Sequence, residues 1–182
     1  MIMSTTTTHL MTAEEFSNLP DDDFRHELVK GELLTMTPPK PLHGRISANL
    51  IFILTTYVKA HDLGEVWAES GFHLETGPDT IIGPDLSFSL KSRISSDLNS
   101  YTSGPPDLAI EVRSTGDRRG KVERKATMWL DFGIRSLWVV NPAKRTVEVF
   151  HSNGERKVFH ENDELVDDTV PGFRVAVSKI FE

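Results

Sequence analysis

Residues 136–140, SLWVV, form a short and continuous apolar run. Asn141 and Pro142 follow directly and predict a turn that ends it. A strand without alternating polar positions is typical of the centre of a sheet, where neighbouring elements bury both of its faces. We therefore predict a central strand here, in a sheet that other elements cover on both sides.

Two segments have the apolar spacing of amphipathic helices. The first runs from His43 to about Ala60, and the second from about Arg118 to Asp131. Each ends near a glycine, Gly64 or Gly133, which favours helix termination. Their buried stripes are predicted to contain Ile46, Leu50, Ile53, Leu54 and Tyr57 in the first helix, and Val122, Ala126, Trp129 and Leu130 in the second.

The remaining patterned segments are strand candidates. EVWAESGFHLE, TIIGPDLSFSL and DLAIEV lie between the two helices, while TVEVF and FRVAVSKIF follow SLWVV. HELV and ELLTM flank Lys30 and Gly31 and predict an N-terminal hairpin. Thr12 and Glu15 form a capping-box pattern for a short first helix. The order helix, three strands, helix, strand predicts a mixed α/β sandwich around one sheet.

Composition limits the class of protein. We expect one domain over residues 12–182 after a flexible segment 1–11, because the length is 182 residues and 38% of them are hydrophobic. There is no long apolar run and no secretory signal pattern, so we expect a cytoplasmic protein without a membrane partner. The formal charge of −7 argues mildly against non-specific coating of nucleic acid.

Several kinds of site find no support in the sequence. Without cysteine, a metal must be held by carboxylate, imidazole or backbone oxygen, which favours hard cations. The seven histidines show none of the close pairings of zinc sites. No phosphate-binding glycine loop and no serine-nucleophile motif is present, so no nucleotide cofactor is expected.

Two Pro-Asp pairs precede strand candidates that have one apolar and one polar face. Asp107 and Glu111 lie four residues apart on one strand, roughly 13 Å at about 3.3 Å per residue, so they cannot share a metal ion. Asp85, on the neighbouring strand candidate, can lie opposite Glu111 at about 5 Å. Asp85 is therefore the better partner for Glu111, and Asp107 is interpreted as a turn residue.

These residues, in this order of elements, resemble the PD-(D/E)XK nuclease superfamily, and within it the Uma-two family of restriction-endonuclease-like proteins. The resemblance runs from Thr12 to Phe181 through HELVKGELLTMTPPKPLHGRI, GPDLSFSL, PDLAIEVRSTGDRRGKVERKATMWLDFGIRSLWVVNPAKRTVEVF and VPGFRVAVSKIF. It implies a restriction endonuclease-like α/β core of helix, three strands, helix and strand. An N-terminal hairpin and extra C-terminal strands would extend a single mixed sheet flanked by helices.

The resemblance also implies a site and an activity. Asp85, Glu111 and the backbone carbonyl of Val112 would hold Mg²⁺ or Mn²⁺, with Glu32 as a further candidate ligand and His43 near the site. Lys125 would supply the catalytic cation, because Arg113 stands where the superfamily motif has lysine. The implied activity is metal-dependent hydrolysis of DNA phosphodiester bonds. Residues 113–125, with six cations and two carboxylates, would suit a phosphate backbone.

Alternatives remain open at this point. Arg113 and Lys125 are both candidates for the essential cation, and Lys125 could instead cover apolar surface with its stem. The RRGKVERK run could be an ordinary solvated helix face. The nuclease fold could also serve as a weak or inactive module that binds nucleic acid or a protein partner. An enzyme that cuts both strands of a duplex would need two sites, which predicts a homodimer.

Overall fold

The computed structural model describes residues 9–20, 22–114 and 119–182. Among these residues the central element is a six-stranded mixed sheet in the order β11-β10-β9-β8-β6-β3. All its neighbouring strands pair antiparallel except β8 and β9, which are parallel and joined through a helix. The strands are β3 (Gly64–Ala68), β6 (Leu86–Leu90), β8 (Leu108–Val112), β9 (Ser136–Asn141), β10 (Thr146–His151) and β11 (Arg156–Phe159).

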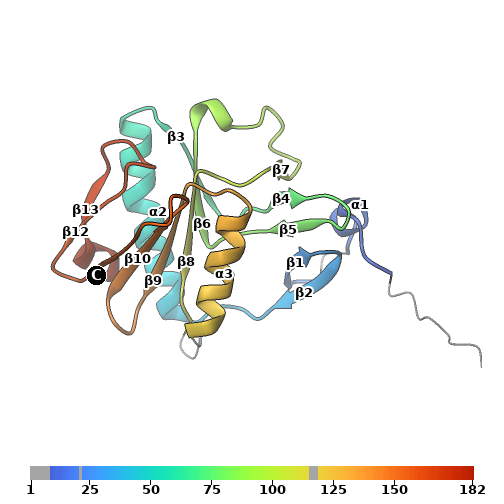
Figure 1. The fold of residues 1–182 in the computed structure, drawn as a ribbon, viewed down its shortest axis with the longest axis horizontal. Helices are drawn as coiled ribbons and strands as arrows, with labels where there is room; N and C mark the ends of the chain where they lie inside the picture. Colours follow the sequence, from blue (N-terminus) through green and yellow to red (C-terminus); the bar gives the residue numbers. More distant parts are fainter. Residues whose placement is uncertain (1–8, 21, 115–118) are drawn as a thin grey trace, which may run out of the picture.

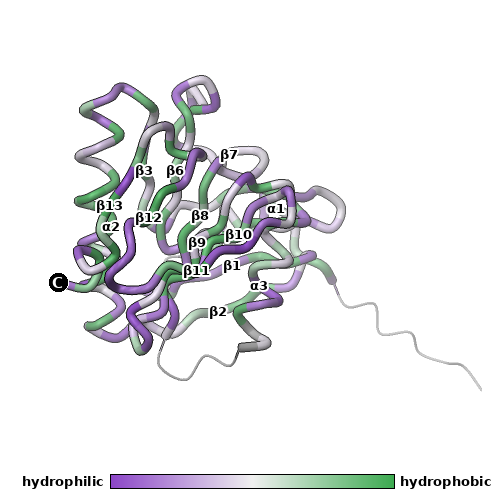
Figure 2. Tube along the Cα trace, turned by 60° about the vertical axis from the view of Figure 1, so that its left-hand side comes forward, coloured by the Kyte–Doolittle hydropathy of each residue, from purple (hydrophilic) through white to green (hydrophobic). Residues whose placement is uncertain are grey.

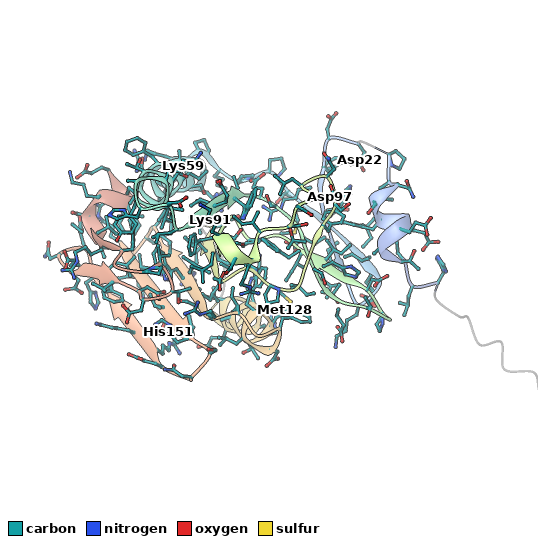
Figure 3. All side chains as sticks on the ribbon, turned by 90° about the horizontal axis from the view of Figure 1, so that it is seen from above. Asp22, Lys59, Lys91, Asp97, Met128 and His151 are labelled. Carbon is teal, nitrogen blue, oxygen red and sulfur yellow. The ribbon has the colours of Figure 1, made fainter. Side chains whose placement is uncertain are left out.

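Two helices cover opposite faces of this sheet, α2 (Pro41–Ala60) and α3 (Arg119–Asp131) (Figure 1). Figure 3, seen from above, places Lys59 of α2 and Met128 of α3 on opposite sides of the strands. The core on the α2 side contains Leu50 and Leu54 with Leu108, and the core on the α3 side contains Trp129 with Ala109. Alternate residues of β8 thus face different helices, as the sequence pattern predicts.

The prediction of a buried central strand is confirmed. Leu137, Trp138 and Val140 of β9 are fully buried, and Val139 is 3% exposed. The strands β8 and β9 are coloured as hydrophobic in Figure 2. The predicted order of helix, three strands, helix and strand is present as α2, then β3, β6 and β8, then α3 and β9.

The prediction of a single mixed sheet is wrong, although the α/β class is confirmed. A second sheet has the order β2-β1-β5-β4-β7, and a third pairs β12 with β13. The additional elements are α1 (Ala13–Ser17), β1 (Arg25–Val29), β2 (Glu32–Met36), β4 (Phe72–Glu75), β5 (Thr80–Ile82), the 3₁₀ turn η1 (Lys91–Arg93), β7 (Thr102–Ser103), β12 (Glu164–Val166), β13 (Arg174–Ala176) and the 3₁₀ turn η2 (Val177–Phe181).

The second sheet exists because two strand candidates break in the middle. Gly83 and Pro84 separate β5 from β6, and proline cannot donate a hydrogen bond to a strand ladder. Residues 69–71 separate β3 from β4, and this second break begins at Glu69, which has a positive φ of 50°. Each candidate therefore contributes one strand to each of two sheets, and the junctions lie beside Asp85.

The N-terminal segments match their patterns. Thr12 and Glu15 form the predicted capping box of α1. Lys30 and Gly31, with φ of 51° and 77°, make the two-residue turn of the β1–β2 hairpin. Residues 1–8 of the predicted flexible segment, and Arg118 at the predicted start of the second helix, lie outside the described residues. No helix in the described ranges has the length and apolar character needed to span a membrane.

Candidate active site

Asp85 lies at the start of β6, directly after the Pro84 break. The register of β6 and β8 pairs Leu86 with Ile110, so Asp85 comes opposite Glu111 one step further along. The Val112 N–H donates to Asp85 Oδ2 at 2.7 Å. Burial alone would raise the pKa of Asp85, but His43, the Val112 N–H and Lys125 together lower it below its usual value. Asp85 is therefore an ionised carboxylate at the end of the central sheet.

Glu111 projects from β8 toward α3, where two side chains bind it. Trp129 Nε1 donates to Glu111 Oε1 at 3.0 Å, and Lys125 Nζ lies 2.9 Å from Glu111 Oε2. The side chain of Glu111 is only 13% exposed. Burial raises the pKa of Glu111, the neighbouring Asp85 raises it further, and Lys125 and Trp129 oppose both. The two carboxylates thus interact at the same end of β6 and β8.

Lys125 reaches Glu111 because of its helical spacing. Lys125 and Trp129 are one turn apart on α3, so both side chains can contact the same carboxylate. The lysine side chain is 27% exposed. Burial alone would lower the pKa of Lys125, but Glu111, Glu27 and Asp85 raise it above its ordinary value. Its ammonium group is therefore held in an acidic cluster, which a lysine that only covered apolar surface would not require.

His43 lies in the first turn of α2, which begins at Pro41, a residue suited to the first helical position. Its Nε2 donates to Asp85 Oδ2 at 3.1 Å. The hydrogen bond to Asp85 raises the pKa of His43, and burial opposes it. His43 therefore orients and helps to neutralise Asp85 from the opposite face of the sheet.

Sequence reasoning missed two residues of β1. Arg25 Nη1 lies 3.6 Å from Asp85 Oδ1, and Arg25 Nη2 donates to the Gly83 carbonyl. Glu27 is only 6% exposed, and its charge contributes to the raised pKa of Lys125. The sequence contained a signal for Glu27. It is an ionisable residue directly before Leu28 and two residues after Arg25, in a strand that has to pack against the core.

Glu32, proposed from the resemblance, lies exposed on β2 opposite Val29 in the hairpin. Arg113 is half-buried just beyond β8, where its N–H donates to the Val140 carbonyl at 2.9 Å. The structure thus brings together Asp85, Glu111, Lys125 and His43, and it adds Arg25 and Glu27. It gives no contact between Glu32 and this group.

Asp107 lies at the opposite end of β8 and is 1% exposed. Its Oδ2 accepts from the Leu90 N–H at 2.9 Å, and its Oδ1 accepts from Arg93 Nη1 at 2.9 Å. These bonds join the end of β6 to the start of β8. Asp107 is a structural carboxylate outside the candidate site.

The donor set of the site is suited to a hard divalent cation. Asp85, Glu111 and Glu27 supply carboxylate oxygens, the ligand type that Mg²⁺ and Mn²⁺ prefer. Buried Glu27 Oε1 accepts no hydrogen bond from the described residues, and its ion-pair partner Arg25 Nη2 lies 3.7 Å away. Within the described ranges no three histidine or carboxylate side chains already form a metal cluster. Lys125 pairs with Glu111 and so neutralises part of the negative charge that would attract a divalent cation.

Comparisons with known proteins concern the family and the fold. The model of the Uma2 family, described as "Putative restriction endonuclease", matches residues 13–178. The fold is similar to the crystal structure of "a putative nuclease belonging to DUF820 from Anabaena variabilis", with a TM-score of 0.79 and 22% identity over 94% of this chain and 97% of that one. No curated protein sequence matches significantly.

Proposed function

Because the chain belongs to the Uma2 family, we propose that it is a metal-dependent endonuclease that hydrolyses DNA phosphodiester bonds. The observation that carries the proposal is the convergence of Asp85, Glu111 and Lys125 at one end of the strands β6 and β8 of the central sheet. Two acidic ligands beside a cation suit hydrolysis of an anionic ester. The fold alone would not distinguish this activity from others.

Asp85, Glu111 and the carbonyl of Val112 would hold Mg²⁺ or Mn²⁺. When bound, the ion would lower the pKa of a water molecule and neutralise charge on the scissile phosphate. His43 and the Val112 N–H orient Asp85, and Trp129 orients Glu111. Lys125 Nζ would donate to the phosphate oxygen that gains negative charge. Arg113 cannot serve as a proton acceptor, but it could clamp a neighbouring phosphate.

The experiment is cleavage of supercoiled and single-stranded DNA with Mn²⁺, Mg²⁺ or chelator. We expect metal-dependent cutting by the parent protein, and a loss of at least about 100-fold in Asp85→Asn and Lys125→Met. Asp62→Asn is the matched control, since Asp62 is 82% exposed and pairs with Lys91. Circular dichroism would show that each variant is folded.

Glu27→Gln and Glu32→Gln separate the two candidate acids of the N-terminal hairpin. If Glu27 belongs to the site, its variant loses activity and the Glu32 variant does not, because the charge of Glu27 raises the pKa of Lys125 whereas Glu32 lies exposed on β2. The reverse result would restore the assignment of Glu32 from the family resemblance.

The second candidate function is a nuclease-fold module that binds nucleic acid or protein without cutting. The formal charge of −7 favours it, as does the closed ion pair between Lys125 and Glu111. If the parent protein cuts with neither metal, and calorimetry detects no Mn²⁺ binding, the module becomes the better assignment.

The proposal extends to assembly and location. Cutting both strands of a duplex needs two sites related by symmetry, so the active form would be a homodimer. It would act on DNA in the cytoplasm.

A further inference from the structure

A pocket of about 540 Å³ lies between the end of β3 and the loop that leads into β7. Its volume falls within the range of small-ligand sites. Figure 3 shows Asp97, within this loop, toward the side of the second sheet. The lining includes aromatic and apolar side chains with small polar ones, among them Trp67, Phe72, Leu98, Asn99, Ser100 and Tyr101. The mechanism above uses none of these residues.

The pocket borders the candidate active site. Trp67 pairs with Ser87 in the β3–β6 ladder, and directly opposite residues share a face. Asp85 precedes Ser87 by two residues, so the Cα atoms of Trp67 and Asp85 are about 8 Å apart by strand geometry. Ser70, which lines the pocket, follows Glu69, whose N–H donates to the Asp85 carbonyl at 3.1 Å.

A second connection runs through side chains. The Glu69 carboxylate lies 3.8 Å from Arg25 Nη1, and the same nitrogen lies 3.6 Å from Asp85 Oδ1. The Cα separation of about 8 Å between Trp67 and Asp85, together with this connection through Glu69 and Arg25, places the pocket lining beside the carboxylate that is proposed to hold the metal. This separation suits two neighbouring parts of a single substrate.

The Tyr101 ring of the pocket wall is held in place by the fold. A Cβ at Gly71 would come within 2.8 Å of the Tyr101 ring, so the ring packs directly on the glycine backbone. The ring centroid of Phe16 lies 5.8 Å away from that of Tyr101. Tyr101 nevertheless remains 41% exposed, and Leu98 is 63% exposed. A fixed ring with accessible area is suited to stacking against a flat ligand.

We propose that this pocket binds an unpaired nucleobase of the substrate, next to the phosphate at the active site. The inference rests on the proposed function. The lining contains no lysine or arginine, so it suits the base and not the phosphate backbone. Stacking on aromatic side chains accepts any base, and Asn99 and the nearby hydroxyl groups can bond to base edges. A base within a duplex would have to leave its stack before entering.

Trp67 offers a direct measurement. Trp129 and Trp138 are fully buried, whereas Trp67 is half-buried at the pocket. Trp129 also contacts Glu111 of the active site, so the part of the ligand-induced quenching that is lost in Trp67→Phe is the part that reports Trp67. The probes are a single-stranded thymidine oligonucleotide, its duplex with a complementary strand, and a deoxyribose-phosphate oligomer of equal length without bases. Chelator prevents cleavage throughout.

We expect saturable quenching by the single strand, weaker quenching by the duplex, and none by the oligomer without bases. Trp67→Ala and Tyr101→Ala should each lower the affinity, measured by fluorescence anisotropy of labelled DNA, by roughly ten-fold. Trp67→Phe should retain most of the affinity, because it keeps a ring. Phe52→Ala is the matched control, since Phe52 is a 72% exposed ring on α2.

Equal binding of the oligonucleotide and the oligomer without bases would overturn the proposal, as would unchanged affinity in the folded Trp67 and Tyr101 variants. Comparable quenching by duplex and single strand would mean that a base of the duplex leaves its stack and enters the pocket, and it would still support the pocket as the binding site. The pocket and the nuclease activity can fail separately. Base-dependent binding in chelator, together with no cleavage when Mn²⁺ or Mg²⁺ is supplied, rejects only the nuclease. Cleavage with an unaltered KM in Trp67→Ala rejects only the pocket.

Discussion

At the scale of single residues, the site depends on one ion pair. Lys125 and Glu111 are both largely removed from solvent, and each compensates the charge of the other. Removing one partner leaves an uncompensated buried charge, which costs more than the net contribution of the intact pair. The pair therefore matters for folding before any substrate or metal is present.

Lys125→Met keeps the apolar stem of the side chain and removes its charge. We expect the free energy of unfolding to fall by about 3 kcal/mol at pH 7 in urea titrations without divalent metal. Without Lys125 the folded-state pKa of Glu111 lies further above its unfolded value, so the difference from the parent should shrink as the pH falls through that pKa.

The control is the double variant Glu111→Gln with Lys125→Met, which removes both charges. Its stability should recover part of the loss, and the double-mutant cycle measures the coupling of the pair. A double variant no more stable than Lys125→Met would contradict this account. Mn²⁺ should also stabilise Lys125→Met more than the parent, because the metal can replace the lost positive charge.

At the scale of elements, the β4–β5 hairpin of the second sheet is bound to α1 by one carboxylate. Asp79 Oδ2 accepts from the Ala13 N–H at 2.7 Å, at the start of α1, and His73 Nε2 donates to Asp79 Oδ1 at 3.0 Å. The backbone N–H and His73 lower the pKa of Asp79 below its usual value. The ionised form is therefore the one that binds α1 to the sheet.

Asp79→Asn should lower the free energy of unfolding by about 1 kcal/mol at pH 7. A lowered folded-state pKa contributes stability above the unfolded pKa of about 3.9, and this contribution is lost as the pH falls through the folded value. The difference between parent and variant should thus decrease between about pH 5 and pH 2. Urea titrations across this range test it, and a constant difference would exclude the ionised carboxylate as the cause.

At the scale of the whole molecule, the C-terminal segment completes the core of the helix α2. Phe173, Val177, Ile180 and Phe181 share one apolar cluster with residues of α2 and the central sheet. The buried carboxylate of Asp167 accepts from Trp138 Nε1 at 2.6 Å, which fixes the start of this segment on β9. The last residues of the chain thus close the side of the sheet that α2 covers.

Ile180→Ala removes a fully buried side chain from this closure. We expect the free energy of unfolding to fall by about 3 kcal/mol, as for other large-to-small substitutions in a core. Val166→Ala, at a position that is 39% exposed, should change it by less than about 0.5 kcal/mol. Similar effects of the two substitutions in thermal and urea unfolding would show that the segment is not part of the cooperative core.

Assembly is also a property of the whole molecule. If the protein cuts duplex DNA as a symmetric pair, sedimentation at increasing concentration should show a dimer at the concentrations where both strands are cut. A monomer throughout, with double-strand cutting retained, would reject the pair.

Local patterns predicted much of the fold and part of the site. The apolar run of β9, the helical spacing of α2 and α3, and the alternation in β8 each depend on neighbouring residues, so the sequence contains them directly. The same alternation placed Asp85 and Glu111 on the polar faces of their strands, while the rise per residue along a strand excluded Asp107. The assignment of Lys125 came from family resemblance, and its contact with Glu111 is consistent with that assignment.

What the sequence by itself determined is therefore the α/β class, the order of the central elements and the face on which Asp85 and Glu111 lie, because strand and helix periods act over a few residues. Only the tertiary structure decided the division into three sheets and the inward position of Glu27. It also decided the contacts of Arg25 and His43 with Asp85. These features join segments up to 60 residues apart, from Arg25 to Asp85, and no local period specifies how such segments pack.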